Sequence, residues 1–192
     1  MTDEELVAAA LEGVEDWAVS RRAAGEVPEP GAMRSVADGA VVELREVTAD
    51  NVRPVMLLQV APGQWGFVAP NAVSIAQAAF APLRWSRAVY ADDVPVGFAL
   101  LSLDEAKREY FLWRFMIDAR FQGLGYGRAA MGLIAEHVRE LPGAAALVTS
   151  WVPAPGGPEP FYRGLGFEPT GAVEDGEVVA RLDLTSEAAP TV

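Results

Sequence analysis

Apolar residues follow strand-like spacing in several stretches of the chain. Between residues 110 and 117 (Tyr-Phe-Leu-Trp-Arg-Phe-Met-Ile), apolar side chains occupy both alternating sets of positions. This pattern is typical of a strand that is buried on both faces. Residues 176–184 alternate apolar with polar positions, as expected of the last strand. Further strands are predicted at residues 41–47, 86–90, 94–103 and 144–152. The two middle stretches form a predicted hairpin around Asp92 and Asp93.

A helical period appears after residue 125. Apolar positions between Ala130 and Leu141 recur at offsets of three and four, which gives a helix one core-facing stripe. Shorter helical segments are predicted between a cap at Thr48 or Asp50 and residue 80. Together with the strands, these helices predict an α/β (α+β) fold with a mixed, mostly antiparallel sheet flanked by helices.

The first 40 residues are expected to form an extension. Residues 3–22 place apolar side chains, including Leu11 and Trp17, on one face of an amphipathic helix, and residues 25–39 have the Pro and Gly content of a linker. The apolar face needs a cover, which is either the rest of the chain or a second copy in a homodimer. We therefore predict an N-terminal helical extension with its linker at residues 1–40 and one domain at residues 41–186.

The composition fits a single domain that needs neither a membrane nor a metal. With 192 residues and 51% apolar content, the chain can bury one sizeable core. No apolar run approaches the roughly 20 residues of a membrane-spanning helix, and the acidic start of the chain is unlike a signal peptide. Zero cysteines and one histidine argue against disulfides, a zinc site and a Ser-His-Asp triad. We expect a soluble, cytoplasmic protein without a metal site.

The charge argues against one class of partner. A formal net charge of -12 opposes nucleic-acid binding, which needs clustered Lys and Arg. The acidic surface either keeps the protein soluble or contributes carboxylates to a site for amines. The carboxylates considered for such a site are Asp92, Asp93, Asp104, Glu105 and Glu159.

Three alternating glycines lie between the strand at residues 110–117 and the following helix, within residues 120–128 (Arg-Phe-Gln-Gly-Leu-Gly-Tyr-Gly-Arg). The first turn of a helix leaves N–H groups unpaired and carries the positive end of the helix dipole, so it stabilises an anion. Because glycine lacks Cβ, a ligand can approach the main chain closely. Arg128, and also Arg120, can add charge-assisted contacts to phosphate oxygens. This segment therefore predicts a phosphate-binding turn.

The spacing of the glycines separates this turn from two other nucleotide-binding motifs. A P-loop ends in Gly-Lys-Ser/Thr, whereas the single lysine, Lys107, lies far from the turn. A dinucleotide fingerprint places an acidic residue about 20 positions further on, where residues 144–152 carry none. The remaining pattern is Gln/Arg-x-x-Gly-x-Gly/Ala. Gln122-Gly123-Leu124-Gly125-Tyr126-Gly127 matches it and resembles the acyl-CoA-binding motif of the GCN5-related N-acetyltransferase (GNAT) family.

A second motif strengthens the resemblance. Phe161-Tyr162-Arg163-Gly164-Leu165-Gly166-Phe167 is similar to the family's Phe/Leu-Tyr-x-x-x-Gly-Phe segment, which closes a short helix and leads into the penultimate strand. One helix and one strand separate the two motifs, as in the family. The resemblance covers roughly residues 41–186 and implies the GNAT fold, with a sheet of about six to seven strands. The closest likeness is to members that act on small amines and diamines.

The resemblance also implies where the co-substrate, acetyl-CoA, binds. The main chain of Ile117, Asp118 and Ala119 would pair with the pantetheine arm, and a main-chain N–H there would stabilise the acetyl oxygen. Tyr162 would lie near the thioester sulfur, where its phenol protonates the departing thiolate. The expected cofactor-binding residues are Ile117, Asp118, Ala119, Gln122, Gly123, Leu124, Gly125, Tyr126, Gly127 and Arg128.

The resemblance leaves the base that accepts the amine proton open. Some relatives carry a glutamate in the fifth strand, but residues 147–151 hold no carboxylate. Glu109, at the start of the fourth strand, is one candidate, although such glutamates are often only solvated. A relay water held by Ser150 or Thr149 is another. Residues 153–160, a Pro- and Gly-rich loop, replace an asparagine that binds the pantetheine in many relatives, and similar loops occur in relatives assigned to diamines and polyamines.

Three kinds of residue near the motifs are expected to serve packing or the acceptor pocket. His137 falls on the apolar stripe of the helix, which favours a packed histidine. Trp113 and Trp151 fall on the two strands that splay apart in the family, so they either wall an acceptor pocket or pack in the core. Arg114 interrupts a buried strand and is expected to pair with a carboxylate.

The sequence thus predicts an acetyl-CoA-dependent N-acetyltransferase. The expected acceptor is the primary amine of a small molecule, first of all a diamine or polyamine, and transfer is direct, without a covalent enzyme intermediate. The alternatives in the same class are acetylation of a protein N-terminus or of an aminoglycoside-like compound. A catalytically silent acyl-CoA-binding module is the alternative from another class, which the missing fifth-strand glutamate favours and Tyr162 opposes.

Overall fold

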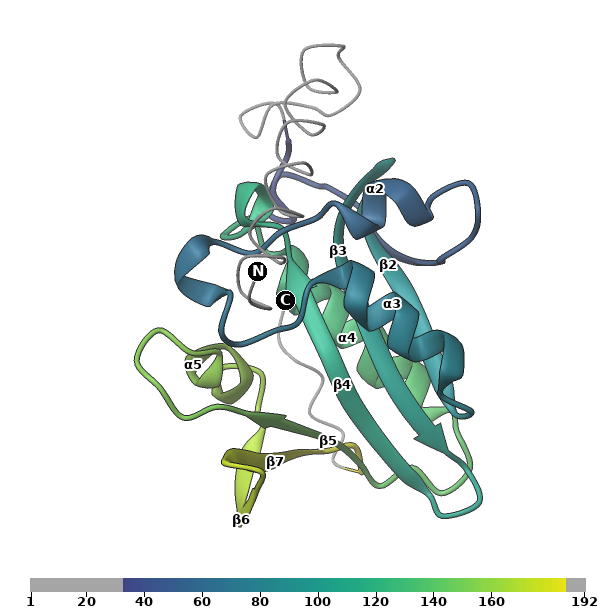
Figure 1. The fold of residues 1–192 in the computed structure, drawn as a ribbon, viewed down its shortest axis with the longest axis vertical. Helices are drawn as coiled ribbons and strands as arrows, with labels where there is room; N and C mark the ends of the chain where they lie inside the picture. Colours follow the sequence, from purple (N-terminus) through teal and green to yellow (C-terminus); the bar gives the residue numbers. More distant parts are fainter. Residues whose placement is uncertain (1–32, 186–192) are drawn as a thin grey trace, which may run out of the picture.

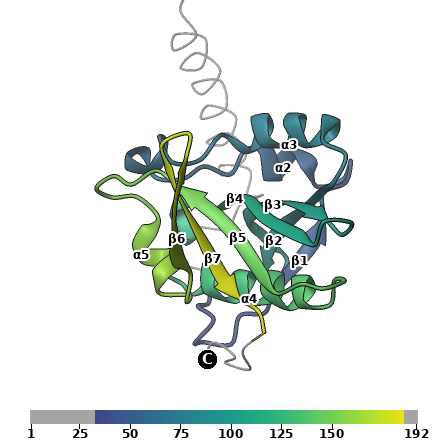
Figure 2. The same ribbon diagram turned by 90° about the horizontal axis from the view of Figure 1, so that it is seen from below.

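A seven-stranded mixed sheet lies between two layers of helices in the computed structural model, which describes residues 33–185 (Figures 1 and 2). The strand order is β1-β2-β3-β4-β5-β7-β6, and only β4 and β5 of these neighbours are parallel. The fold predicted from the sequence is therefore confirmed. The strands are β1 (Val42–Glu46), β2 (Arg84–Ala91), β3 (Val94–Asp104), β4 (Glu109–Ile117), β5 (Ala146–Trp151), β6 (Glu168–Glu174) and β7 (Glu177–Asp183). The helices are α2 (Val52–Met56), α3 (Asn71–Phe80), α4 (Tyr126–Arg139) and α5 (Glu159–Arg163), with single turns of 3-10 helix at Pro62–Gln64 and Ala119–Phe121.

Helices α2 and α3 cover one face of the sheet, and α4 covers the other (Figure 2). Under α2 and α3, Val55 and Ala78 pack on Phe98 and Met116 of the sheet. The predicted stripe of α4 is buried against the opposite face, where Ile134 and Val138 have no exposed surface. Between residues 33 and 185, no helix has the length and apolar content that crossing a bilayer requires. The amphipathic helix predicted at residues 3–22 lies outside the described residues.

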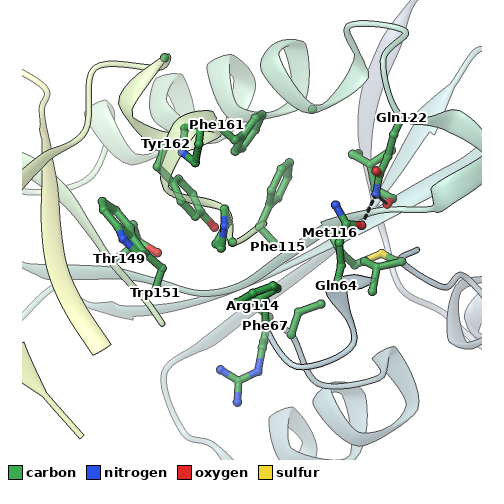
Figure 3. A pocket seen from close by; sticks show the side chains of 18 of the residues that line it. Gln64, Phe67, Arg114, Phe115, Met116, Gln122, Thr149, Trp151, Phe161 and Tyr162 are labelled. Atoms are coloured by element: carbon green, nitrogen blue, oxygen red, sulfur yellow. Dashed lines mark hydrogen bonds between the residues drawn. The ribbon is translucent and has the colours of Figure 1, made fainter. Parts of the chain in front are cut away.

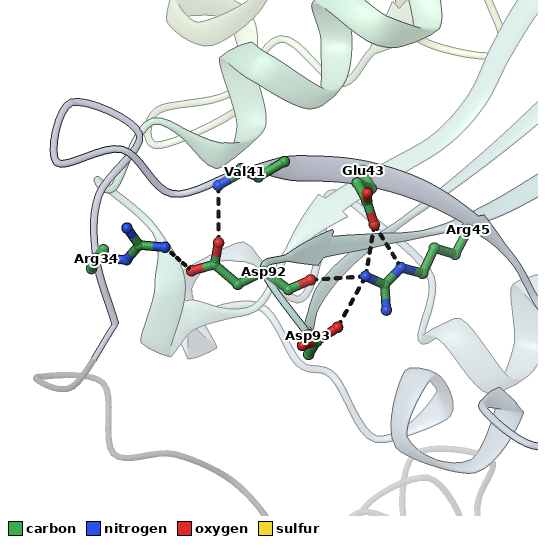
Figure 4. A network of polar contacts seen from close by, with 6 residues as sticks. All are labelled: Arg34, Val41, Glu43, Arg45, Asp92 and Asp93. Atoms are coloured by element: carbon green, nitrogen blue, oxygen red, sulfur yellow. Dashed lines mark hydrogen bonds and ion pairs between the residues drawn. The ribbon is translucent and has the colours of Figure 1, made fainter.

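The predicted hairpin around Asp92 joins β2 and β3. Asp92 has a φ of 52°, the left-handed conformation that a two-residue hairpin turn favours. Its carboxylate accepts hydrogen bonds from the N–H of Val41 at 3.1 Å and from the guanidinium of Arg34 at 2.9 Å (Figure 4). The turn is thereby tied to the segment that precedes β1.

That segment, residues 33–40, packs against the back of the glycine turn. The N–H of Val36 donates to the carbonyl of Leu124 at 2.9 Å, and the Tyr126 hydroxyl donates to the carbonyl of Arg34. Val36 and the buried Ala40 belong to the same apolar cluster as Tyr126. These residues, which the sequence assigns to a linker, therefore contact the domain, and the boundary at residue 41 stays a prediction.

Strands β4 and β5 separate soon after they meet. Their pairing is confined to Phe111 with Val148 and Leu112 with Thr149. Trp113 forms a bulge in β4. Leu101 of β3 pairs with Leu112 and the next residue, Leu100, pairs with Arg114, so Trp113 has no partner on β3. A bulge bends a strand and increases its twist, which accounts for the divergence of β4 from β5. The gap between these strands holds the cavity that is the candidate functional site.

Candidate functional site

A cavity of about 590 Å³ occupies the gap between β4 and β5 (Figure 3). Its wall is formed by β4, the glycine turn and the start of α4 on one side, and by β5, the 156–164 segment and Glu177 on the other. The loop between α2 and α3 contributes Gln64 and Phe67. Because both faces of the sheet contribute to the wall, a molecule on one face can meet a molecule on the other through this gap.

The glycine turn has the geometry of an anion site. Gly123 and Gly125 adopt positive φ values of 78° and 87°, and Gly125 caps α4. The first hydrogen bond of α4 runs from the N–H of Ala129 to the carbonyl of Gly125 at 3.1 Å. The amides of residues 126–128 precede that bond, so they have no partner within the helix. This arrangement can hold a phosphate group at the positive end of α4.

Most of the predicted cofactor-binding residues line the cavity. They are Ile117, Gln122, Gly123, Gly125, Tyr126, Gly127 and Arg128. The side chain of Arg128 donates to the carbonyl of Gly164 at 3.0 Å, which holds it across the start of α4. By contrast, the guanidinium of Arg120 forms an ion pair with the Asp118 carboxylate at 2.7 Å, so its charge is already paired within the protein.

Three of the predicted cofactor-binding residues, Asp118, Ala119 and Leu124, are not among the residues that line the cavity. The N–H of Asp118 donates to Val96 and that of Ala119 to Gln59, each at 2.8 Å. The Asp118 carboxylate, which is buried, also accepts from the N–H of Gln59 at 2.9 Å. The amides of Asp118 and Ala119 thus join loops to the sheet.

The edge of β4 that faces the gap is formed by Phe115 and Ile117. Because main-chain groups alternate in direction along an antiparallel ladder, and the N–H of Asp118 points to β3, those of Phe115 and Ile117 point toward β5. No pairing with β5 reaches this part of β4. The Gln122 side chain donates to the Ile117 carbonyl at 2.9 Å. It also donates to Gln64 Oε1 at 2.9 Å, the bond drawn in Figure 3. Of the three residues expected to pair with the pantetheine arm, only Ile117 has this orientation. Phe115, which was not among them, shares it.

Tyr162 reaches the cavity from α5, and its hydroxyl points into it (Figure 3). The ring stacks on Trp151 at 5.5 Å and meets the edges of Phe161 and Phe167 at 5.4 Å. Burial raises the pKa of Tyr162 to about 12, an effect that the Thr149 hydroxyl opposes and the charge of Glu177 reinforces. The phenol is therefore protonated at neutral pH and can act as a proton donor.

Ser150 and Glu177 form a pair on the wall of the cavity. The Ser150 hydroxyl donates to a carboxylate oxygen of Glu177, which projects from the neighbouring strand β7. Ser150 was predicted and Glu177 was not. The signal was indirect: β5 lacks a carboxylate, and the strand that pairs with β5 supplies one. Without the strand order, nothing in residues 176–184 distinguishes Glu177 from a solvated glutamate.

Glu109, the other candidate base, is not brought to the cavity. It is exposed and lies opposite Asp104 at the start of β4. The gap opens beyond Leu112, so Glu109 lies on the side where β4 and β5 are still paired. The structure therefore does not support Glu109 as the base.

Arg114 lines the cavity on the opposite side of β4 from Phe161 and Tyr162, near Phe67 (Figure 3). Its Nη1 donates to the carbonyl of Trp113 at 2.8 Å, and its Nε is buried without a hydrogen-bond partner. No ion pair to Arg114 occurs within residues 33–185, so the expected pairing with a carboxylate is not found there.

The two tryptophans and the histidine occupy different places. Trp113 and Trp151 both line the cavity, and Trp151 is also part of the core. His137 does not line the cavity but stacks on Trp85 with ring centroids 4.5 Å apart. This is the packed position that the apolar stripe of α4 favours.

The sequence of the chain matches a protein-family model and bacterial relatives. A model described as the acetyltransferase (GNAT) family matches residues 58–167, more than half of the chain. The spermine/spermidine N(1)-acetyltransferase of Bacillus subtilis (strain 168) is 28% identical over 106 residues, which cover 52% of this chain and 70% of that protein.

Solved structures show the same fold. An acetyltransferase from Thermus thermophilus has a TM-score of 0.58 at 19% identity, covering 74% of this chain and 97% of that one. A Bacillus subtilis acetyltransferase in complex with CoA has a TM-score of 0.55 at 17% identity, covering 75% and 98%. At these identities the likeness concerns the fold alone.

Proposed function

Because the chain belongs to the acetyltransferase (GNAT) family, and is thus an acetyl-CoA-dependent N-acetyltransferase, we propose that it transfers the acetyl group directly to the primary amine of a small molecule. One observation carries the proposal. The cavity between β4 and β5 holds a protonated phenol, Tyr162, and a carboxylate, Glu177, on its wall. A donor and an acceptor of protons therefore face the same gap.

The residues around the glycine turn fit CoA. The amides of residues 126–128 and the Arg128 guanidinium would hold the diphosphate. A Cβ atom built at Gly123 meets no atom within 4 Å, so the turn is open to a ligand. The free edge of β4 at Phe115 and Ile117 would hold the pantetheine arm by main-chain hydrogen bonds. When bound, acetyl-CoA supplies the acetyl group as an activated thioester.

The chain's own groups would balance the protons of the transfer. A C–N bond forms and a C–S bond breaks, so the amine nitrogen must lose a proton and the sulfur must gain one. We assign Glu177 as the acceptor of the amine proton, directly or through the Ser150 hydroxyl. We assign Tyr162 as the donor of the proton that the sulfur gains. The Phe115 or Ile117 amide would stabilise the negative charge that develops on the acetyl oxygen. Solvent restores both side chains after the products leave.

The shape of the cavity favours a small acceptor over a protein N-terminus. The Cε1 atom of Phe67 lies 3.3 Å from where a Cβ of Gly157 would be, so the α2–α3 loop meets the Pro/Gly loop beside the gap. Bacterial relatives that are named for spermine and spermidine support a diamine or polyamine as one candidate. An aminoglycoside-like compound, which is also a small molecule with primary amines, is a second candidate.

The proposal is tested by thiol release from acetyl-CoA in the presence of a broad panel of small amines, with mass spectrometry to find the acetylated product. We expect one or more amines to gain a single acetyl group. CoA binding by calorimetry, measured in parallel, separates an enzyme from a silent module. Tight binding of CoA without turnover of any amine would support the silent module and contradict the proposed function.

A further inference from the structure

Arg114 faces the acceptor side of the gap. The bulge at Trp113 shifts by one residue which side chains of β4 point to each face of the sheet. After it, Met116 packs under α2 and α3, whereas Phe115 packs toward α4. Side chains two positions apart share a face of a strand, which places Arg114 with Met116, on the side of the sheet opposite the glycine turn and α4. The acceptor enters from this side if acetyl-CoA occupies the other.

The guanidinium of Arg114 has unused hydrogen-bonding capacity. An arginine carries five N–H donors, and the described residues accept one hydrogen bond from this one, at the Trp113 carbonyl. Its buried Nε has no partner. Arg45 and Arg163, in contrast, hold carboxylates at 2.6 Å and 2.7 Å. A buried donor without a partner costs stability, so a ligand that accepts from Arg114 would be stabilised there.

Glu177 is the acidic group that interacts electrostatically with Arg114. Burial lowers the pKa of Arg114, and the charge of Glu177 partly restores it. The two side chains form no ion pair among the described residues, and Glu177 accepts a hydrogen bond from Ser150. A positive and a negative group therefore face one cavity without being joined in an ion pair. Such a cavity is complementary to a molecule that carries both charges.

We infer that the acceptor is an amine that also carries a carboxylate, such as an α- or ω-amino acid, with its carboxylate on Arg114 and its amine at Glu177. This inference rests on the proposed function and narrows its substrate class. The planar fork of a guanidinium matches a carboxylate and can bind it with two parallel hydrogen bonds.

A polyamine fits this cavity less well. Its second ammonium group would meet a guanidinium that forms no ion pair within residues 33–185, and like charges in a partly buried site repel strongly. Among the small amines proposed above, we therefore expect amino acids to be better acceptors than the spermine and spermidine for which the relative at 28% identity is named.

The test compares acceptors that differ in one group. Thiol release is measured with ω-amino acids of three to six carbons, the alkylamines and diamines of matched length, and the common α-amino acids. We expect kcat/KM to be roughly 10- to 100-fold higher for the best amino acid than for its matched alkylamine, and the matched diamine to be no better than the alkylamine.

Variants of Arg114 link that preference to the residue. In Arg114→Met the ratio between amino acid and alkylamine should fall toward one, and Arg114→Lys should keep part of it because the charge remains. Arg181→Met is the matched control, since Arg181 is exposed on the same face of β7 as Glu177 and does not line the cavity; it should keep the full ratio. Circular dichroism checks that each variant is folded.

Three outcomes would overturn the inference, and only the last of them would also overturn the proposed function. If alkylamines or diamines react at least as well as every amino acid, or if Arg114→Met and Arg114→Lys both keep the wild-type ratio, the carboxylate assignment fails and the proposed function stands. If the wild type binds CoA and acetylates no amine of any class, the proposed function fails and the assignment fails with it.

Discussion

The rings of Trp151 and Tyr162 stack with their centroids 5.5 Å apart and their planes at 9°. Trp151 is on β5 and Tyr162 is on α5, so this stack fixes α5 against the strand beside the gap. The phenol that is proposed to protonate the thiolate is thereby held in one orientation.

Replacing Tyr162 with Phe removes the hydroxyl and keeps the stack. We expect kcat to fall roughly 10- to 1000-fold with little change in the KM for acetyl-CoA, because only the proton donor is lost. Steady-state kinetics measure both constants. Tyr110→Phe is the control, since that buried hydroxyl donates to Pro142 at 2.8 Å, away from the cavity, and its loss should leave kcat intact. An unchanged kcat in Tyr162→Phe would show that another group, or water, protonates the thiolate.

Replacing Glu177 with Gln removes the proposed base and keeps its size. We expect kcat to fall about 100-fold, and Ser150→Ala to cause a smaller fall, because the hydroxyl orients the carboxylate or relays the proton. Glu109→Gln serves as the control and should behave like the wild type, since Glu109 is exposed outside the cavity. A loss of kcat in Glu109→Gln but not in Glu177→Gln would reverse the assignment of the base.

Two glycines of α4, one at its N-cap and one in its middle, should respond to alanine in opposite ways. Gly125 has a φ of 87°, and a Cβ there would lie 3.1 Å from the Cβ of Val36. Gly125→Ala should cost about 1–3 kcal/mol of stability and raise the Kd for CoA. Gly132 lies within α4 with no atom within 4 Å of its built Cβ, so Gly132→Ala should gain up to about 1 kcal/mol. Thermal melts and CoA titrations measure these effects, and a Gly125→Ala protein as stable as the wild type would contradict the strain argument.

His137 should make stability depend on pH in the weakly acidic range. Burial, together with the charge of Arg87, lowers its pKa from the ordinary value of 6.5. The folded state therefore binds the proton more weakly than the unfolded state, so this contribution to stability is complete above about pH 6.5 and is lost as the pH falls through the lowered pKa. His137→Phe keeps a ring against Trp85 and removes the titration. Urea unfolding from pH 5 to 8 should show a flatter profile for the variant, and identical slopes would contradict this account.

The sequence was most informative where the site is continuous along the chain. The strand before the glycines, the turn itself and the stripe of α4 each follow a local pattern, so residues 110–141 and the motif around Tyr162 could be predicted. The mixed sheet followed from the strands and from the family resemblance.

The residues that the sequence did not assign depend on contacts between distant strands. Glu177 reaches the gap because β7 pairs with β5, and Arg114 lies on the α2 and α3 side of the sheet because Trp113 forms a bulge in β4. Neither fact is encoded in the local pattern. Glu109 was a candidate because a glutamate can act as a base. The sequence does not show at which residue of β4 the two strands separate, so it could not show that Glu109 lies away from the gap.

The contact between Val36 and Gly125 bears on where the protein can be shortened. A fragment that starts at Val41 keeps every side chain that touches the cavity, yet it loses the residues that press on the rear of the glycine turn, along with the acceptor for the Tyr126 hydroxyl. The smallest fragment suited to expression for CoA-binding work therefore begins at or before Met33.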